Sequence, residues 1–273
     1  MRVVCVANNK GGVGKTTSAI NLSAAIAGAG YRVMLIDMDP QSNASTGLAG
    51  SLREAAKGTT LALMAREVED IGSIALETTV PGMLLVPAQS ELTGIEPRLG
   101  GASPKPYILR QALLRHPPAV DFIFIDTPPT MNMLSVNALM AADEVLVPID
   151  LGEFAITGIR VLDAMIDTLG KDLDHTIGPD LRRILITMFD RTTTIHAVLL
   201  QDVLDMYPER LLKTKIPRNV TIREAQLKGR PISQYDSSCP GAFAYRQLAD
   251  ELLSVAPFTE GNVGTGVVAS KAE

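Results

Sequence analysis

A short glycine-rich segment holds the residues whose types and spacing most clearly indicate chemistry. Residues 10–17 read KGGVGKTT, with an apolar run at 2–7 before them and helical spacing of apolar residues after them. Glycines let the backbone wrap closely around an anion, and N–H groups at the start of a helix point toward it. This strand–loop–helix order is the context that a phosphate-binding P-loop requires. The alternative is an ordinary glycine-rich turn before a helix, but such a turn would not need the complete motif. We therefore expect Gly11, Gly12 and Gly14 to hold the phosphates of a nucleotide.

Three side chains at the end of this loop have separate expected roles. Lys15 should reach the β- and γ-phosphates, the Thr16 hydroxyl should ligate Mg²⁺, and Thr17 should donate a hydrogen bond to the α-phosphate. The predicted cofactors are therefore ATP and Mg²⁺. GTP is not expected, because no NKxD motif for guanine recognition follows a late strand.

Carboxylates at the ends of two apolar runs could place the metal ion and the attacking water. Asp37 and Asp39 end one run, and their spacing of two residues puts both on the same side of an extended chain. Asp126 ends the run FIFID, which is a Walker B pattern. An α/β sheet binds its ligand at the carboxyl ends of its strands. We expect Asp39 to orient the water, Asp37 to support the Mg²⁺ shell through Thr16, and Asp126 to hold Mg²⁺ through water.

Strands that alternate with helices must position these residues. Apolar runs without polar alternation indicate strands that are buried on both faces, and their alternation with helical patterns indicates right-handed crossovers. The predicted fold is α/β: a doubly wound, mostly parallel sheet with helices on both faces. The expected strands are 2–7, 32–37, 83–88, 122–126, 144–149 and 183–188, and the expected helices lie near 15–29, 106–116, 132–142, 156–170, 194–206 and 240–254.

The domain organisation follows from the same pattern. We expect one P-loop ATPase domain over residues 1–255 and a disordered C-terminal tail over 256–273, which is rich in glycine and small residues and has no helical periodicity. Residues 42–80 show no clear pattern.

Composition and charge narrow the functional classes. The net charge of −5 argues against indiscriminate nucleic-acid binding by the whole surface, but residues 182–230 carry ten Lys or Arg and five Asp or Glu, a net +5. Cys5 and Cys239 form no CxxC pair, which fits a reducing cytoplasm, and no apolar run approaches the ~20 residues of a membrane span. The C-terminal segment does not have the pattern of a membrane-targeting amphipathic helix.

The P-loop departs from the general motif in a way that resembles one family. Asn9 replaces the usual first glycine and Lys10 follows it, giving KGGxGK[ST]. This is the deviant Walker A signature of the ParA/Soj partition ATPases, MinD, the nitrogenase iron protein and the arsenite-pump ATPases. The segments DMDPQSNASTGL (37–48), DTPPTMNMLSVNAL (126–139), TMFDRTTT (187–194) and IPRNVTIREAQLKGRPISQYD (216–236) resemble the ParA/Soj branch, so the resemblance extends from residue 2 to about 254.

The resemblance implies roles for several further residues. Lys10 would reach across the interface of an ATP-bound homodimer to the partner's nucleotide, Pro217 and Asn219 would contact adenine, and Arg191 and Arg218 would contact DNA. It also implies a cytoplasmic, nucleoid-associated ATPase that binds double-stranded DNA without reading its sequence and needs no membrane. A ParB-like or other cargo adaptor would stimulate hydrolysis, and its cargo could be a chromosome, a plasmid or a protein cluster.

Several departures leave alternatives open. Gln226 stands where the family motif EAP has proline, and residues 237–240 lack the basic side chains that often follow YD. The second hypothesis is a MinD-like ATPase that acts in spatial positioning at a membrane. An iron–sulfur reductase would need cluster-ligating cysteines, and a kinase would need an acceptor-site signature; the sequence shows neither.

Overall fold

One sheet of eight strands organises the part of the chain that the structure describes. The computed structural model describes residues 1–49, 57–95, 105–173, 179 and 181–254. The strand order is β3-β4-β2-β5-β1-β6-β7-β8, and every neighbouring pair is parallel except β3 with β4. The strands are β1 (Arg2–Val6), β2 (Val33–Asp37), β3 (Leu76–Glu77), β4 (Met83–Val86), β5 (Phe122–Asp126), β6 (Glu144–Asp150), β7 (Leu181–Phe189) and β8 (Leu211–Pro217).

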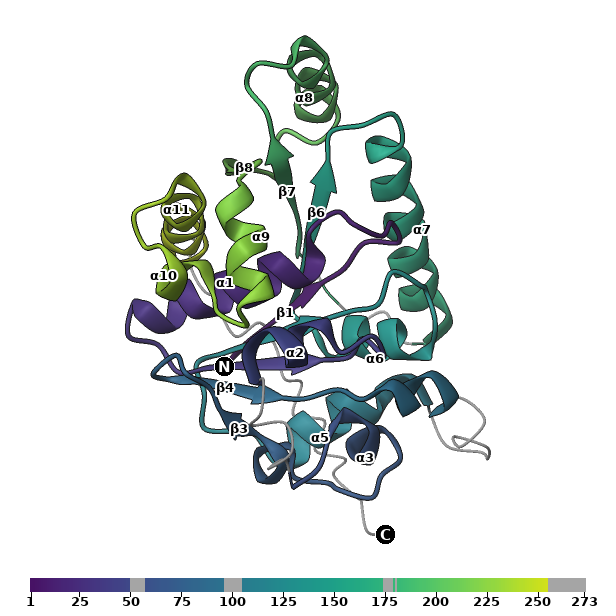
Figure 1. The fold of residues 1–273 in the computed structure, drawn as a ribbon. Helices are drawn as coiled ribbons and strands as arrows, with labels where there is room; N and C mark the ends of the chain where they lie inside the picture. Colours follow the sequence, from purple (N-terminus) through teal and green to yellow (C-terminus); the bar gives the residue numbers. More distant parts are fainter. Residues whose placement is uncertain (50–56, 96–104, 174–178, 180, 255–273) are drawn as a thin grey trace, which may run out of the picture.

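Helices cover both faces of this sheet. They are α1 (Lys15–Gly28), α2 (Asn43–Ala49), α3 (Thr60–Met64), α5 (Ile108–Arg115), α6 (Met133–Ala141), α7 (Ala155–Leu173), α8 (Thr194–Met206), α9 (Val220–Leu227), α10 (Ile232–Tyr235) and α11 (Pro240–Ser254). Short 3-10 turns lie at Ile71–Ile74, Ser90–Gly94 and Lys105–Tyr107. Figure 1 shows α9, α10 and α11 grouped beside α1, apart from α7. The predicted doubly wound α/β fold is confirmed.

The core consists of two apolar layers, one on each face. Alternate residues of a strand point to opposite faces, and in β1 the side chains of Val3 and Cys5 join one cluster whereas Val4 and Val6 join the other. The first cluster contains residues of α3, α5, α6 and α7, and the second contains residues of α1, α2, α9, α10 and α11. All residues of β2 and β5 are buried, which explains their uninterrupted apolar runs.

The order of the strands determines where the P-loop lies. β1 pairs with β5 on one side and with β6 on the other, so the loop after β1 lies where the chain changes direction across the sheet. Register places Asp126 beside both Val6 and Asp37, which brings three strand ends together. A crevice at such a switch point is where open α/β sheets bind ligands.

The structure also shows elements that the sequence pattern did not indicate. β8 follows α8 as an edge strand, β3 is a two-residue antiparallel strand, and α2 and α3 lie within the ambiguous segment 42–80. The expected tail at 256–273 lies outside the described residues, so that boundary stays a prediction.

Candidate functional site

The P-loop is a tight backbone turn between β1 and α1. Gly12 (φ 75°) and Gly14 (φ 84°) adopt the left-handed conformation that glycine tolerates best. The N–H of Ser18 donates to the Gly14 carbonyl at 2.8 Å, which starts α1 directly after the loop. Asn8 supports the first half of the loop, since its amide donates to the Pro148 carbonyl at 2.8 Å and its oxygen accepts from the Lys10 N–H at 3.0 Å. The loop is therefore held by the fold before any ligand arrives.

Lys15 folds back across this loop. Its Nζ donates to the Lys10 backbone carbonyl at 2.9 Å, and most of the side chain is buried. Burial lowers the pKa of Lys15, and the charges of Asp126 and Asp39 act in the opposite direction. A partly desolvated ammonium next to exposed backbone of Gly11 and Gly12 is suited to binding phosphate oxygens.

The fold itself uses both carboxylate oxygens of Asp37. One oxygen accepts from the Asp39 N–H at 3.0 Å, and the other accepts from the N–H and the hydroxyl of Ser45 at 2.8 and 2.6 Å. Burial is the largest influence on this carboxyl and raises the pKa of Asp37 to about 6. Ser45 in turn accepts from the Ala88 N–H at 2.8 Å. Asp37 therefore ties the loop that carries Asp39 to α2 and to the end of β4.

The carboxylate of Asp126, unlike that of Asp37, is not satisfied by hydrogen bonds in the part of the chain that the structure describes. Both of its oxygens are buried and have no hydrogen-bond partner among the residues described. Burial and then the charge of Asp37 raise the pKa of Asp126 well above its usual range, while Thr16 and Lys15 lower it. The Thr16 hydroxyl is close enough to favour the carboxylate, although its geometry falls short of a hydrogen bond.

This arrangement fits a magnesium ion. Unpaired buried polar atoms are rare in proteins and call for an explanation such as an ion. Carboxylate and hydroxyl oxygens are the ligands that Mg²⁺ prefers, usually together with waters and substrate phosphates. Thr16 and Asp126 supply that donor set beside the P-loop.

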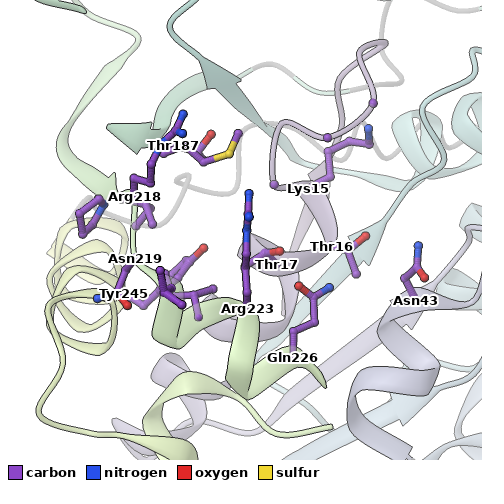
Figure 2. Close-up of a pocket in the computed structure, with 18 of the residues that line it drawn as sticks. Lys15, Thr16, Thr17, Asn43, Thr187, Arg218, Asn219, Arg223, Gln226 and Tyr245 are labelled. Carbon is purple, nitrogen blue, oxygen red and sulfur yellow. The ribbon is translucent and has the colours of Figure 1, made fainter. Parts of the chain in front are cut away.

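A cavity of about 460 Å³ opens from the P-loop toward β8 and α9. Its volume falls in the range of small-molecule sites. Figure 2 shows the side chains around it, with Lys15 and Thr16 on one side and Arg218 and Asn219 on the other. The lining residues are Gly11, Gly12, Gly14, Lys15, Thr16, Thr17, Asp39, Gln41, Asn43, Pro129, Thr187, Met188, Ile216, Pro217, Arg218, Asn219, Val220, Ile222, Arg223, Gln226 and Tyr245.

Most of the residues expected to bind nucleotide thus meet at one cavity. Pro217 and Asn219, predicted adenine contacts, lie on its wall although they are about 200 residues from the P-loop in sequence. Asn219 also caps α9, since its oxygen accepts from the Thr221 N–H at 2.8 Å. Asp37 and Asp126 are fully buried and do not line the cavity.

Sequence reasoning missed other parts of the wall. Thr187 lies near the end of β7, and its hydroxyl approaches the carbonyls of Val13 at 2.9 Å and Ile149 at 3.0 Å. Met188 follows with a positive φ of 50°, a rare conformation for a residue with a side chain. Tyr245 of α11 is buried, with its hydroxyl 3.4 Å from that of Ser18. The segment TMFD drew attention to the first two, but nothing in the local sequence indicated Tyr245.

Lys10 does not line the cavity of its own chain. Its Nζ lies 4.0 Å from the position that a Cβ of Gly152 would occupy, so the side chain faces the loop between β6 and α7. The side chain of Lys10 is only partly buried, and the neighbouring Gly11 and Gly12 are exposed.

The basic stretch 182–230 divides into paired and unpaired arginines. Arg182 and Arg210 form ion pairs with Asp163, and Arg183 pairs with the buried Glu144 at the amino end of β6. Arg191 and Arg218 are exposed and make no ion pair within the described ranges. Arg218 borders the cavity, and Arg191 lies beyond it in the loop after β7.

Cysteine, metal-cluster and membrane features do not define a second site. Cys5 and Cys239 are buried and unbridged, and burial raises the pKa of the Cys5 thiol. Among the residues that the structure describes, no group of three or more His, Cys, Asp and Glu is arranged to hold a metal ion. None of the described helices has the length and apolar character to cross a membrane.

Comparison with known proteins gives consistent results. Residues 1–178 match the family described as AAA domain. The chain is 38% identical over 256 residues to the chromosome partitioning protein ParA of Caulobacter vibrioides, which covers 93% of this chain and 94% of that protein. It is also 38% identical over 254 residues to the chromosome-partitioning ATPase Soj of Thermus thermophilus, covering 93% and 96%.

A solved structure adds information on ligands. A protein described as cobyrinic acid a,c-diamide synthase from Mycobacterium smegmatis, with bound ADP and magnesium, is 32% identical and has a TM-score of 0.77. The match covers 93% of this chain and 94% of that chain. Since the identity to the curated relatives extends over almost the whole of both chains, the protein belongs to the ParA/Soj family of chromosome-partitioning ATPases.

Proposed function

We propose that this P-loop ATPase, which uses ATP and Mg²⁺ as its family does, dimerises when it binds ATP and then binds DNA without sequence preference. A cargo-bound partner protein of the ParB type stimulates hydrolysis and releases the ATPase from DNA. Repeated binding and release segregates or positions the cargo. The cytoplasm and the surface of the nucleoid are the expected location.

The observation that carries this proposal is that one cavity joins the phosphate loop to Arg218. Figure 2 shows Lys15 on one side of the cavity and Arg218 and Asn219 on the other, where they connect the end of β8 at Pro217 to α9. A nucleotide that fills the cavity contacts this segment directly. Occupancy can therefore set the orientation of Arg218, which is exposed and carries an unpaired charge among the residues described.

The position of Lys10 supports the dimer. Its side chain lies outside its own cavity, beside exposed glycines at the outer surface of the P-loop. From that surface an ammonium can reach the phosphates of a second copy, where it would stabilise negative charge as an arginine finger does. A dimer also presents two copies of Arg191 and Arg218, which doubles the contacts with DNA phosphates.

The roles of the chain's own groups in hydrolysis follow from their placement. Lys15 and the P-loop N–H groups hold the phosphates, and Thr16 with Asp126 would hold Mg²⁺, which supplies charge neutralisation between the phosphates. Asp39 lines the cavity and is held by Asp37 through its backbone N–H, so its carboxylate can orient the attacking water.

The test is DNA binding by the full chain with Arg218→Glu and Arg115→Glu. Arg115 lies on α5 and is exposed, so it provides the same charge change away from the cavity. Gel shifts use unrelated duplexes, with ATP or ADP, over a salt series. The wild type and Arg115→Glu should bind all duplexes with ATP only, and each neutralised phosphate should contribute about 0.9 to the salt slope.

Arg218→Glu should lose DNA binding while its ATP-dependent dimer remains, measured by size-exclusion chromatography. Wild-type binding that ignores ATP and salt, or that strongly prefers one duplex, would contradict the nucleoid-binding function.

A further inference from the structure

A polar stripe on α9 faces the nucleotide cavity. Asn219 caps α9, and Arg223 and Gln226, which are three residues apart within the helix, lie on the same face of it. All three line the cavity. Arg223 falls on a position that the family motif IPRNVxxxEAP leaves unspecified, so the resemblance gives it no role.

The three residues of the stripe line different parts of the cavity. Figure 2 shows Asn219, which is two residues after Pro217 in sequence, on the side of the cavity opposite Lys15 and Thr16. Gln226 borders a smaller void together with Thr17 and Gly47, which places it at the start of α1. Arg223 lies between them, and Figure 2 shows its side chain extending from α9 into the cavity between Arg218 and Lys15.

The charge of Arg223 has no counterion in the parts of the chain that the structure describes. It is exposed and takes part in none of the ion pairs there, although Glu224 is its neighbour in sequence and lies 3.4 Å from the Tyr235 hydroxyl instead. The cavity wall thus carries three cations, Lys15, Arg218 and Arg223, against one acid, Asp39. A cavity with this excess of positive charge suits a polyanion.

We propose that Arg223 is a nucleotide-contacting residue that binds the α-phosphate. This inference rests on the proposed nucleotide site and adds a residue to it. With the terminal phosphates at Lys15 and the base near Pro217 and Asn219, the middle of the nucleotide lies opposite Arg223. A planar guanidinium can donate two parallel hydrogen bonds to the non-bridging oxygens of one phosphate.

The position of the contact has a consequence for specificity. ATP, ADP and AMP share the α-phosphate, so Arg223 should strengthen the binding of all three and should not affect adenosine. The interaction would also persist after hydrolysis and would slow the release of ADP.

The experiment measures binding of ATP and ADP by calorimetry in the full chain with Mg²⁺, and of AMP and adenosine by competition against ADP. The variants are Arg223→Ala, Arg223→Lys and the control Lys228→Ala, which removes an exposed cation at the end of α9 outside the cavity. Arg223→Ala should weaken all three phosphorylated nucleotides by a similar factor, about tenfold or more for a charge-assisted contact.

In the same series Arg223→Lys should recover part of the affinity, whereas adenosine binding and the control should match the wild type. A raised ADP release rate in Arg223→Ala, followed by stopped flow, is the matching kinetic result.

Three outcomes would overturn the inference. Loss of ATP affinity with normal ADP affinity would place the guanidinium at the γ-phosphate. Unchanged nucleotide affinities with lost DNA binding would assign Arg223 to DNA. A wild type that binds no nucleotide would overturn the proposed function as well. Lys15→Ala distinguishes the two failures: it should abolish ATP binding if only the role of Arg223 is wrong, and it should change nothing if the chain binds no nucleotide at all.

Discussion

Asp37 and Asp126 end neighbouring parallel strands, yet the fold satisfies only one of the two carboxylates. Asp37 accepts hydrogen bonds from Asp39 and Ser45, whereas the oxygens of Asp126 are buried without partners in the described structure. The role expected for Asp37 in the Mg²⁺ shell stays a prediction, and its contacts favour an indirect contribution through Asp39. The buried, unpaired carboxyl group of Asp126 should have a measurable effect on stability.

Asp126→Asn should therefore stabilise the protein when Mg²⁺ and nucleotide are absent. The raised pKa means that the native state binds the Asp126 proton more tightly than the unfolded chain does. Proton binding therefore stabilises the native state at low pH, and this stabilisation is lost as pH rises through the native pKa. Asparagine is neutral and has no such loss, so its advantage should grow with pH and reach about 1–3 kcal/mol near neutral pH.

The measurement is urea unfolding in EDTA at mildly acidic and neutral pH. Adding Mg²⁺ and ATP should reverse the order, because only the wild type retains the carboxylate that would hold the ion. A variant that is less stable than the wild type in EDTA would show that Asp126 has a favourable partner.

At the scale of elements, the strands that could be predicted from the sequence are those that are buried on both faces of the sheet. The interior residues of β1, β2 and β5 are uninterrupted apolar runs because helices cover both of their faces, and charged residues stand only at strand ends. β8 escaped prediction because it is an edge strand, in which Lys213 and Lys215 alternate with buried Leu212 and Ile216. α2 is composed of Asn, Ala, Ser, Thr, Gly and Leu, a poor helix-forming mixture that is held by tertiary hydrogen bonds to Asp37.

The site residues, like the strands, could be predicted only where the local sequence carries a pattern. The P-loop and the terminal carboxylates are local patterns, so their positions could be predicted. Thr187, Arg223 and Tyr245 reach the cavity only through the pairing of β7 and β8 and the packing of α11 on α1. Local sequence carries no information on such contacts between distant segments.

Thr187 provides a test of how β7 supports the P-loop. Thr187→Val keeps the shape of the side chain but removes the hydroxyl that contacts the Val13 and Ile149 carbonyls. We expect a loss of about 1 kcal/mol in the free energy of unfolding, together with weaker ADP binding because the loop is less well positioned.

Thermal unfolding and ADP calorimetry measure both effects. Thr187→Ser keeps the hydroxyl and should lie closer to the wild type in ADP affinity. Wild-type ADP affinity in Thr187→Val would mean that β7 does not position the loop.

At the scale of the whole molecule, the two P-loop lysines should separate nucleotide binding from dimerisation. Lys15 bonds to the backbone carbonyl of Lys10, so Lys10→Ala leaves that bond in place. Lys10→Ala should bind ADP normally but remain monomeric with ATP. Asp39→Ala should bind ATP, hydrolyse it very slowly and accumulate as a dimer.

Light scattering after size-exclusion chromatography, at one protein concentration with ATP or ADP, measures the oligomeric state. Lys15→Ala, which should not bind nucleotide, is the monomeric control. Normal ATP-dependent dimerisation of Lys10→Ala would show that its ammonium does not act across the interface.

The place of Tyr245 in the cavity wall gives the protein an intrinsic optical reporter. The chain contains five tyrosines and no tryptophan, so its ultraviolet emission comes from tyrosine alone. Tyr245 is buried at the cavity, and none of the other four tyrosines lines it. We expect a nucleotide that fills this cavity to change the emission of Tyr245, so that unlabelled nucleotides can be followed as they enter and leave by the fluorescence of the unmodified chain.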